Sequence, residues 1–130
     1  MTQEEEKNLL LKDLCSRLPY GVRYRHFTWN DECGETYIAA RIYSINTDGY
    51  VKNCYDDETV YIDNVRPYLF PLSSMTEEQK KEYQYITERW MYDPAYSISD
   101  STDWLNKNHF DYRGLIEKGL AINATSLNIY

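Results

Sequence analysis

The sequence predicts an α+β fold with an N-terminal helix, a small antiparallel sheet and C-terminal helices. The first observation is that the spacing of apolar residues changes from helical to alternating and back again. The second is that capping-box patterns, typical of helix N-termini, begin at Thr2 and Thr76. The third is the length of 130 residues, which suits a single domain, 1–130, able to bury a core.

The N-terminal helix is expected within 2–18, over 3–17. Thr2 and Glu5 have the spacing at which each side chain satisfies the other's unpaired backbone N–H. Leucines at helical spacing form one stripe, Leu10, Leu11, Leu14 and Leu18. Because the polar face is acidic, this stripe is predicted to pack in the core and not on a membrane.

The antiparallel sheet is expected over 22–65. Four strands are predicted, at Val22–Trp29, Thr36–Ile45, Tyr50–Tyr55 and Thr59–Asp63. Asp48-Gly49 predicts a hairpin, since glycine accepts the positive φ of tight turns. One face of the second strand would carry Tyr37, Ala39, Arg41, Tyr43 and Ile45. Four or five short strands suggest a strongly bent sheet or an SH3-like barrel.

An apolar linker, Val65–Leu72, follows. Pro67 and Pro71 keep it extended, and it is expected to lie across the core, with an exposed groove-binding strip as the alternative. The helical half, 76–121, should contain one helix ending near Tyr92, a second carrying Trp104, and a third running from a cap at Asp111 to Gly119. Trp104 is predicted to be buried, with an exposed interface anchor as the alternative. The tail 123–130 is expected to fray or to form an edge strand.

Charge and cysteine content bound the class of protein. The chain has 21 acidic and 14 basic residues, a net charge of −7, and no Lys/Arg cluster, so we expect no nucleic-acid partner. The acidity favours solubility, with DNA mimicry as the alternative. The short apolar run Leu9–Leu11 after an acidic N-terminus predicts neither a signal peptide nor a membrane span, and therefore a cytoplasmic protein. The widely spaced Cys15, Cys33 and Cys54 indicate thiols and no zinc site.

No catalytic motif is present. There is no phosphate-binding glycine loop, no nucleophile elbow and no zinc-protease motif. His26, His109 and Cys33 lack a matched catalytic partner, and the acids beside Cys33 raise a thiol pKa. We therefore predict that the protein is not an enzyme and has no catalytic residues, no metal and no cofactor.

Fourteen tyrosines suggest a contact surface, although tyrosine is also favoured on half-buried strands. Two functions stay open. The first is a non-enzymatic protein that presents a tyrosine-rich strand surface to a protein partner, and a homo-oligomer is compatible with it. The second is a pocket that sequesters a nucleotide-like anion by stacking and by arginine contacts. The candidate binding residues are Tyr24, Tyr37, Arg41, Tyr43, Tyr50 and Tyr55.

Two segments carry a family resemblance. Pro67–Glu78 (PYLFPLSSMTEE) and Asp103–Ala121 (DWLNKNHFDYRGLIEKGLA) resemble segments of small uncharacterised proteins from Bacteroides genomes, their phages and integrated elements. The resemblance covers the C-terminal half better than the strand region. It implies a protein of a phage or mobile element that acts in the cytoplasm of a bacterial host. Such a protein would act by contact with a host protein, and counter-defence is one such action. It supplies no catalytic residue.

Overall fold

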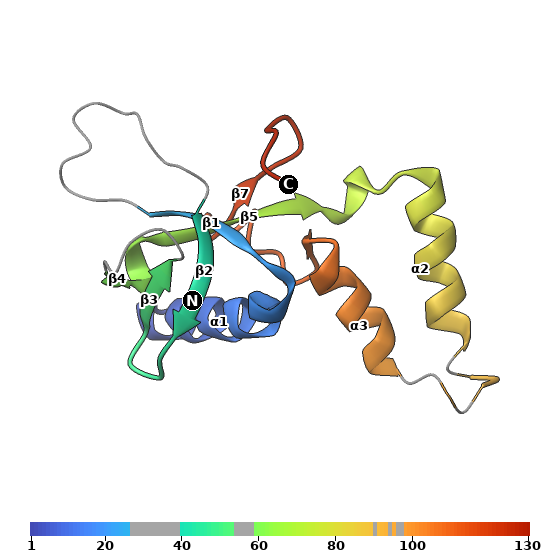
Figure 1. Cartoon of the computed structure of the whole chain (residues 1–130), viewed down its shortest axis with the longest axis horizontal. Coiled ribbons are helices and arrows are strands. Elements are labelled where there is room, and N and C mark those ends of the chain that lie inside the picture. Colours follow the sequence, from blue (N-terminus) through green and yellow to red (C-terminus); the bar gives the residue numbers. More distant parts are fainter. Residues whose placement is uncertain (27–39, 54–58, 90, 94, 96–97) are drawn as a thin grey trace.

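The computed structural model describes residues 1–26, 40–53, 59–89, 91–93, 95 and 98–130. It confirms the α+β class, with a mostly antiparallel sheet between an N-terminal helix and C-terminal helices (Figure 1). The helices are α1 (Gln3–Arg17), α2 (Glu77–Arg89) and α3 (Ile98–Lys107). The strands are β1 (Arg23–His26), β2 (Ala40–Ile45), β3 (Tyr50–Asn53), β4 (Thr59–Tyr61), β5 (Val65–Pro71), β6 (Phe110–Asp111) and β7 (Ile122–Asn123). Predicted strand positions 27–29, 36–39 and 54–55 lie outside the described residues.

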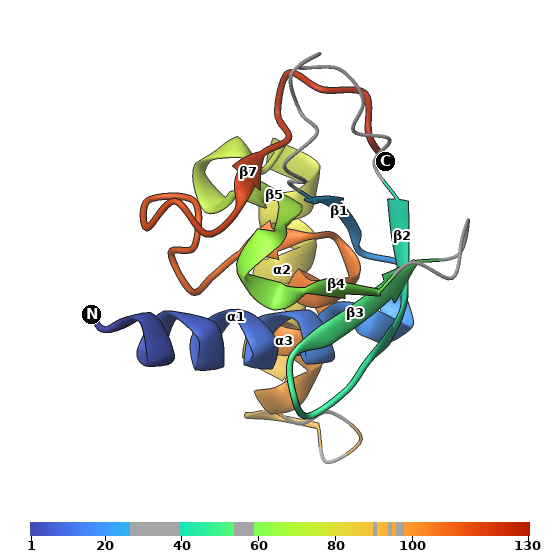
Figure 2. The same ribbon diagram turned by 90° about the vertical axis from the view of Figure 1, so that its left-hand side faces the viewer.

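Helix α1 forms where the sequence predicts it. The Thr2 hydroxyl oxygen accepts the backbone N–H of Glu5 at 3.1 Å, and acids fill the first turn, where the helix dipole favours them. Leu10 and Leu14 are buried against the sheet. The helix gives way to a short 3-10 turn, Leu18–Tyr20, closed by Gly21 at φ 73°. In the orthogonal view α1 lies on one side of the sheet, and β7 and the C-terminus lie toward the other (Figure 2).

The sheet is an open path in the order β4-β3-β2-β1-β5-β6, with β7 also paired to β5. Every pairing within the predicted sheet region is antiparallel, as expected. The two short strands β6 and β7 instead join β5 in parallel. The described strands therefore do not close into the SH3-like barrel that their number suggested.

Strand β5 corrects the prediction of a linker after residue 65. The segment is a strand inside the sheet, although it contains Pro67 and Pro71, and its predicted burial is confirmed for Tyr68 and Leu69. The C-terminal Tyr130 bridges the place where β5 parts from β1. Its hydroxyl accepts the N–H of Arg23 at 2.9 Å and donates to the Tyr68 carbonyl at 2.8 Å. A side chain 62 residues away in sequence thus supplies bonds that a local pattern does not reveal.

The C-terminal half contains two of the three predicted helices. At the start of α2, Thr76 and Gln79 form the predicted capping box, with reciprocal bonds of 3.1 and 2.9 Å. The predicted third helix is wrong, because only a turn forms there, over 115–119. Gly114, at φ 74°, is a left-handed residue that interrupts the helix at its start. The expected terminator is nevertheless present, since Leu120 N–H bonds the Leu115 carbonyl at 2.9 Å.

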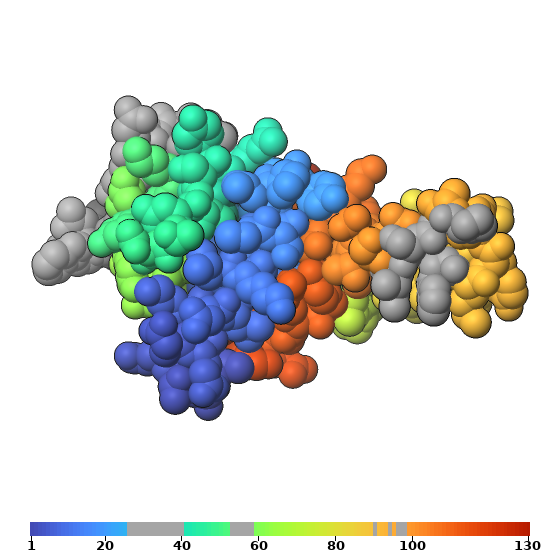
Figure 3. All heavy atoms as spheres, turned by 90° about the horizontal axis from the view of Figure 1, so that it is seen from below, coloured from blue at the N-terminus to red at the C-terminus, as the bar shows by residue number. Residues whose placement is uncertain are grey.

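Two apolar clusters stabilise the molecule. The larger one lies between α1 and the sheet and includes Leu10, Leu14, Tyr24, Ile42, Val51 and Leu69. The smaller one joins α3 to the sheet through Trp104, Leu105 and Phe110. Helix α2 has no buried residue and lies at the far end of the molecule from β2 and β3 (Figure 3). The burial of Trp104, 8% exposed, is as predicted.

Trp104→Ala is expected to lower the free energy of unfolding by about 3–5 kcal/mol. The indole stacks on Phe110 at 5.7 Å between ring centres and contacts Tyr83 at 5.5 Å, so its removal leaves a cavity in the smaller cluster. Urea unfolding measures the change. Tyr92→Ala, at an 81% exposed position, is the control and should stay within about 0.5 kcal/mol of the parent. Equal effects of the two variants would contradict the assignment.

Asp13→Asn is also expected to lower the free energy of unfolding by about 3–5 kcal/mol, because it leaves the buried Arg17 guanidinium without its counter-ion. Asp13 and Arg17 are fully buried and paired at 2.9 Å, and the other carboxylate oxygen accepts from Arg113 at 2.9 Å. The same substitution at an exposed pair, Glu77→Gln, should change stability little. A small loss in Asp13→Asn by chemical denaturation would show that the buried pair is dispensable.

Candidate functional site

The charges of the strands differ from those of the whole chain. Strands β1 to β5 contain no Asp or Glu, although the chain has 21 acidic residues. The same strands contain five cations, Arg23, Arg25, Arg41, Lys52 and Arg66. Among Lys, Arg, Asp and Glu, β1 to β5 therefore contain only the cationic residues.

The strand register places these cations on the face of the sheet that is turned away from α1. Arg23 stands directly opposite Arg41, and their neighbours Tyr24 and Ile42 are buried in the core. Since directly opposed residues of an antiparallel pair point to the same side, both arginines belong to the outer face. Lys52 is exposed beside the buried Val51 and follows the same alternation.

Arg25 and Arg66 form a second directly opposed pair across β1 and β5. The Arg66 guanidinium turns away from that face. It donates to the carbonyl oxygens of Val65 at 2.8 Å, Asp63 at 3.1 Å and Gly119 at 3.1 Å. The outer face therefore keeps four of the five strand cations.

Two exposed tyrosines accompany the cations. Tyr43 is 68% exposed and Tyr50 is 44% exposed. The Tyr50 ring packs edge-on against Tyr61, with 5.4 Å between the ring centres. The register shifts between Ile42 and Ser44, which corrects the predicted alternation: Ile45 packs on the core, and Ser44 pairs with Lys52. A bulge of this kind adds a residue and changes which face the later side chains occupy.

A shallow groove of about 350 Å³ is formed by β2, β3, β4 and the turn that follows β2. Ser44, Ile45, Asn46, Tyr50, Lys52 and Thr59 line it. Arg41 and Lys52 make no ion pair with any described residue. We refer to Arg41, Tyr43, Tyr50 and Lys52 together as the basic sheet face. Its chemistry suits the binding of an anionic group beside an aromatic ring.

The structure places the six predicted binding residues differently. Arg41, Tyr43 and Tyr50 are exposed on the basic sheet face, whereas Tyr24 is fully buried in the core and not available to a partner. Tyr37 and Tyr55 lie outside the described residues. Sequence reasoning missed Lys52 and the opposed arginines, although the alternation of Arg23, Tyr24 and Arg25 was a signal for a charged outer face.

The fold strongly lowers the pKa of His109. It follows α3 with a left-handed backbone, φ 63°, and its ring stacks on Tyr130 at 3.7 Å between centres. Burial lowers the pKa of His109 to about 4, and nearby Arg17 and Arg23 lower it further. The imidazole is therefore neutral at pH 7. Its buried Nδ1 has no hydrogen-bond partner in the described part of the chain.

The remaining chemistry is sparse. Cys15 is an exposed residue, and partial burial of its thiol raises the thiol pKa. Burial also raises the pKa of Tyr130 to about 12. Within the described ranges, no three His, Cys, Asp or Glu side chains lie close enough to hold a metal ion. Nor does that part of the chain contain a helix long and apolar enough to cross a membrane. Cys33 lies outside the described residues.

No family model matches the chain, and no match to it was found among curated proteins or solved structures.

We expect His109 to make stability depend on pH between about 6.5 and about 4. The unfolded imidazole, with its ordinary pKa of 6.5, binds a proton before the folded one does at about 4, so stability is complete above pH 6.5 and falls as the pH drops through this window. His109→Asn keeps a residue that tolerates positive φ but cannot titrate. The measurement is the difference in melting temperature between pH 7 and pH 5. An equal difference in parent and variant would refute this role of His109.

Proposed function

We propose that this is a non-enzymatic binding protein whose basic sheet face contacts an acidic surface of a partner protein. The observation that carries the proposal is charge segregation. Two exposed cations, Arg41 and Lys52, have no ion pair among the described residues and stand beside exposed tyrosines, in a chain with a net charge of −7. Such a face attracts carboxylates and disfavours a second basic surface.

The composition of the face supports a protein partner. Tyrosine and arginine dominate the residues whose truncation weakens protein interfaces most. Tyr43 and Tyr50 expose large flat rings with few rotatable bonds, so their ordering on binding loses little entropy. The groove is shallow, whereas small-molecule pockets enclose most of the surface of their ligand. A broad contact fits this geometry better than an enclosed ligand.

The resemblance of Pro67–Glu78 and Asp103–Ala121 to phage and integrated-element proteins of Bacteroides suggests the setting. We propose that the partner is a host protein in the bacterial cytoplasm and that the contact interferes with host defence. This step rests on association and not on the chemistry of the site.

A second candidate function is the sequestration of a nucleotide-like anion. The observation that favours it is the groove itself, because Tyr50 and Lys52 line one space of about 350 Å³. A base could stack on the tyrosine while its phosphate meets the ammonium group.

Reversal of the charges of Arg41 and Lys52, by Arg41→Glu with Lys52→Glu, is expected to weaken partner binding at least about tenfold, since like charges across an interface cost several kcal/mol. The measurement is capture of the partner from Bacteroides lysate, followed by titration of the purified pair. Lys81→Glu with Lys107→Glu is the matched control, because it changes net charge equally at exposed positions on α2 and α3.

Tyr43→Ala should also weaken the contact, whereas Tyr92→Ala, at the more exposed position, should not. A melting shift with nucleotides that is lost on charge reversal, without any captured protein, would favour the second function. Equal partner affinity in the parent, the reversed variant and the control would refute the role of this face in protein binding.

A further inference from the structure

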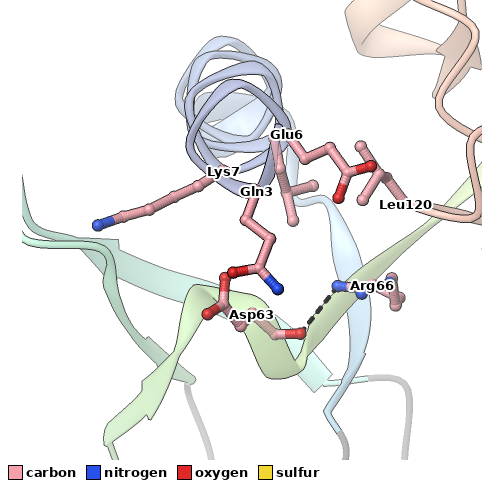
Figure 4. Close-up of a pocket in the computed structure, with 7 residues that line it drawn as sticks. Gln3, Glu6, Lys7, Asp63, Arg66 and Leu120 are labelled. Carbon is pink, nitrogen blue, oxygen red and sulfur yellow. Dashed lines mark hydrogen bonds between the residues drawn. The ribbon is translucent and has the colours of Figure 1, made fainter. Parts of the chain in front are cut away.

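A second cavity lies on the α1 side of the sheet, away from the basic sheet face. It has a volume of about 200 Å³ and lies between α1, the 3-10 turn Ile62–Asn64, the start of β5 and Leu120. Figure 4 shows Gln3 extending from the helix toward Asp63, Glu6 extending toward Leu120, and Arg66 on the opposite wall. Groups of both charges therefore face one small space.

The positive group is Arg66, whose position is fixed. Its Nε and Nη1 donate to three backbone carbonyls, and its Nη2 has no partner in the described residues. Carbonyl oxygens orient the guanidinium but do not neutralise it, and no described carboxylate forms an ion pair with it. A guanidinium held in this way is prepared to bind a carboxylate at little further cost in entropy.

The negative groups are Glu6 and Asp63. Neither makes an ion pair with a described residue. Lys7 lines the same cavity, but its ammonium lies 5.1 Å from the centre of the Tyr61 ring and turns away from Glu6 (Figure 4). The charge of Asp63 acts on Lys7, whereas the Glu6 carboxylate remains available for a cation that enters the cavity.

The remaining wall is apolar. Leu10 and Leu120 line the cavity and are 2% and 5% exposed. An apolar group placed on them would leave water without disturbing the charged walls. The cavity thus combines an anion-binding group, a cation-binding group and a small hydrophobic surface.

We propose that this cavity binds a free α-amino acid with a small apolar side chain. The carboxylate of the amino acid contacts Arg66, its ammonium group contacts Glu6, and its side chain packs on Leu10 and Leu120. A zwitterion satisfies both walls at once, which an anion or a cation alone does not do. The proposal is independent of the basic sheet face, because it uses none of that face's residues.

The test is calorimetric titration of the full chain with L-leucine and two analogues. 4-Methylpentanoate lacks the ammonium group, and isopentylamine lacks the carboxylate. We expect saturable binding of L-leucine, and binding at least about tenfold weaker for each analogue, the loss of one charged contact. Glu6→Gln should weaken L-leucine binding about tenfold and should leave 4-methylpentanoate unchanged.

Glu5→Gln is the matched control, since it removes one carboxylate from the same helix turn without touching the cavity. Helical circular dichroism checks that both variants are folded. Absence of saturable binding up to about 10 mM, ten times the Kd of a weak site, would overturn the proposal. Equal binding of either analogue, or equal effects of Glu6→Gln and Glu5→Gln, would overturn it too. Partner capture through the basic sheet face should be unaffected by Glu6→Gln, so the two proposals can fail separately.

Discussion

A buried arginine joins the two halves of this protein. Arg17 donates to Asp13 on its own helix at 2.9 Å and to the Phe110 carbonyl at 2.6 Å, 93 residues away in sequence. Asp13 also accepts from Arg113, which in turn donates to the Tyr112 hydroxyl at 2.7 Å. A buried ion pair adds little net stability compared with apolar packing, but breaking it is costly. The network therefore permits few other arrangements of α1 against the C-terminal half.

The position of α1 determines both surfaces described above. Phe110, held by Arg17, pairs with Phe70 in β5, so the buried charge also positions the strand that carries Arg66. With α1 fixed over one side of the sheet, Leu10 and Leu14 cover the core. The opposite side, with Arg41, remains at the surface. One covered face and one solvated face is the usual arrangement of an antiparallel sheet.

Local physics made part of this fold predictable. The caps at Thr2 and Thr76, the hairpin at Asp48-Gly49 and the terminator at Gly119 depend on a few neighbouring residues, and each is present. The predictions were wrong or incomplete where contacts between residues distant in sequence determine the structure. β5 forms a strand although it contains two prolines, and the Tyr130 hydroxyl donates a hydrogen bond to the carbonyl of Tyr68, the residue after Pro67. The opposed Arg23 and Arg41 depend on a register that sequence alone does not fix. The i, i+4 spacing of Asp13 and Arg17 can be seen in the sequence, but the sequence does not show that this ion pair is buried.

Electrostatic screening explains how a chain with a net negative charge can carry the basic face that we propose as a binding surface. At physiological ionic strength the potential of a charge decays over about 8 Å, whereas packed layers of secondary structure lie about 10 Å apart. A partner in contact with Arg41 and Lys52 is therefore affected mainly by those cations and less by charges that lie further away than this screening distance. The net charge of −7 governs solubility and long-range repulsion at low salt. At the contact itself the local arrangement of charge decides, and there the strands contribute only cations.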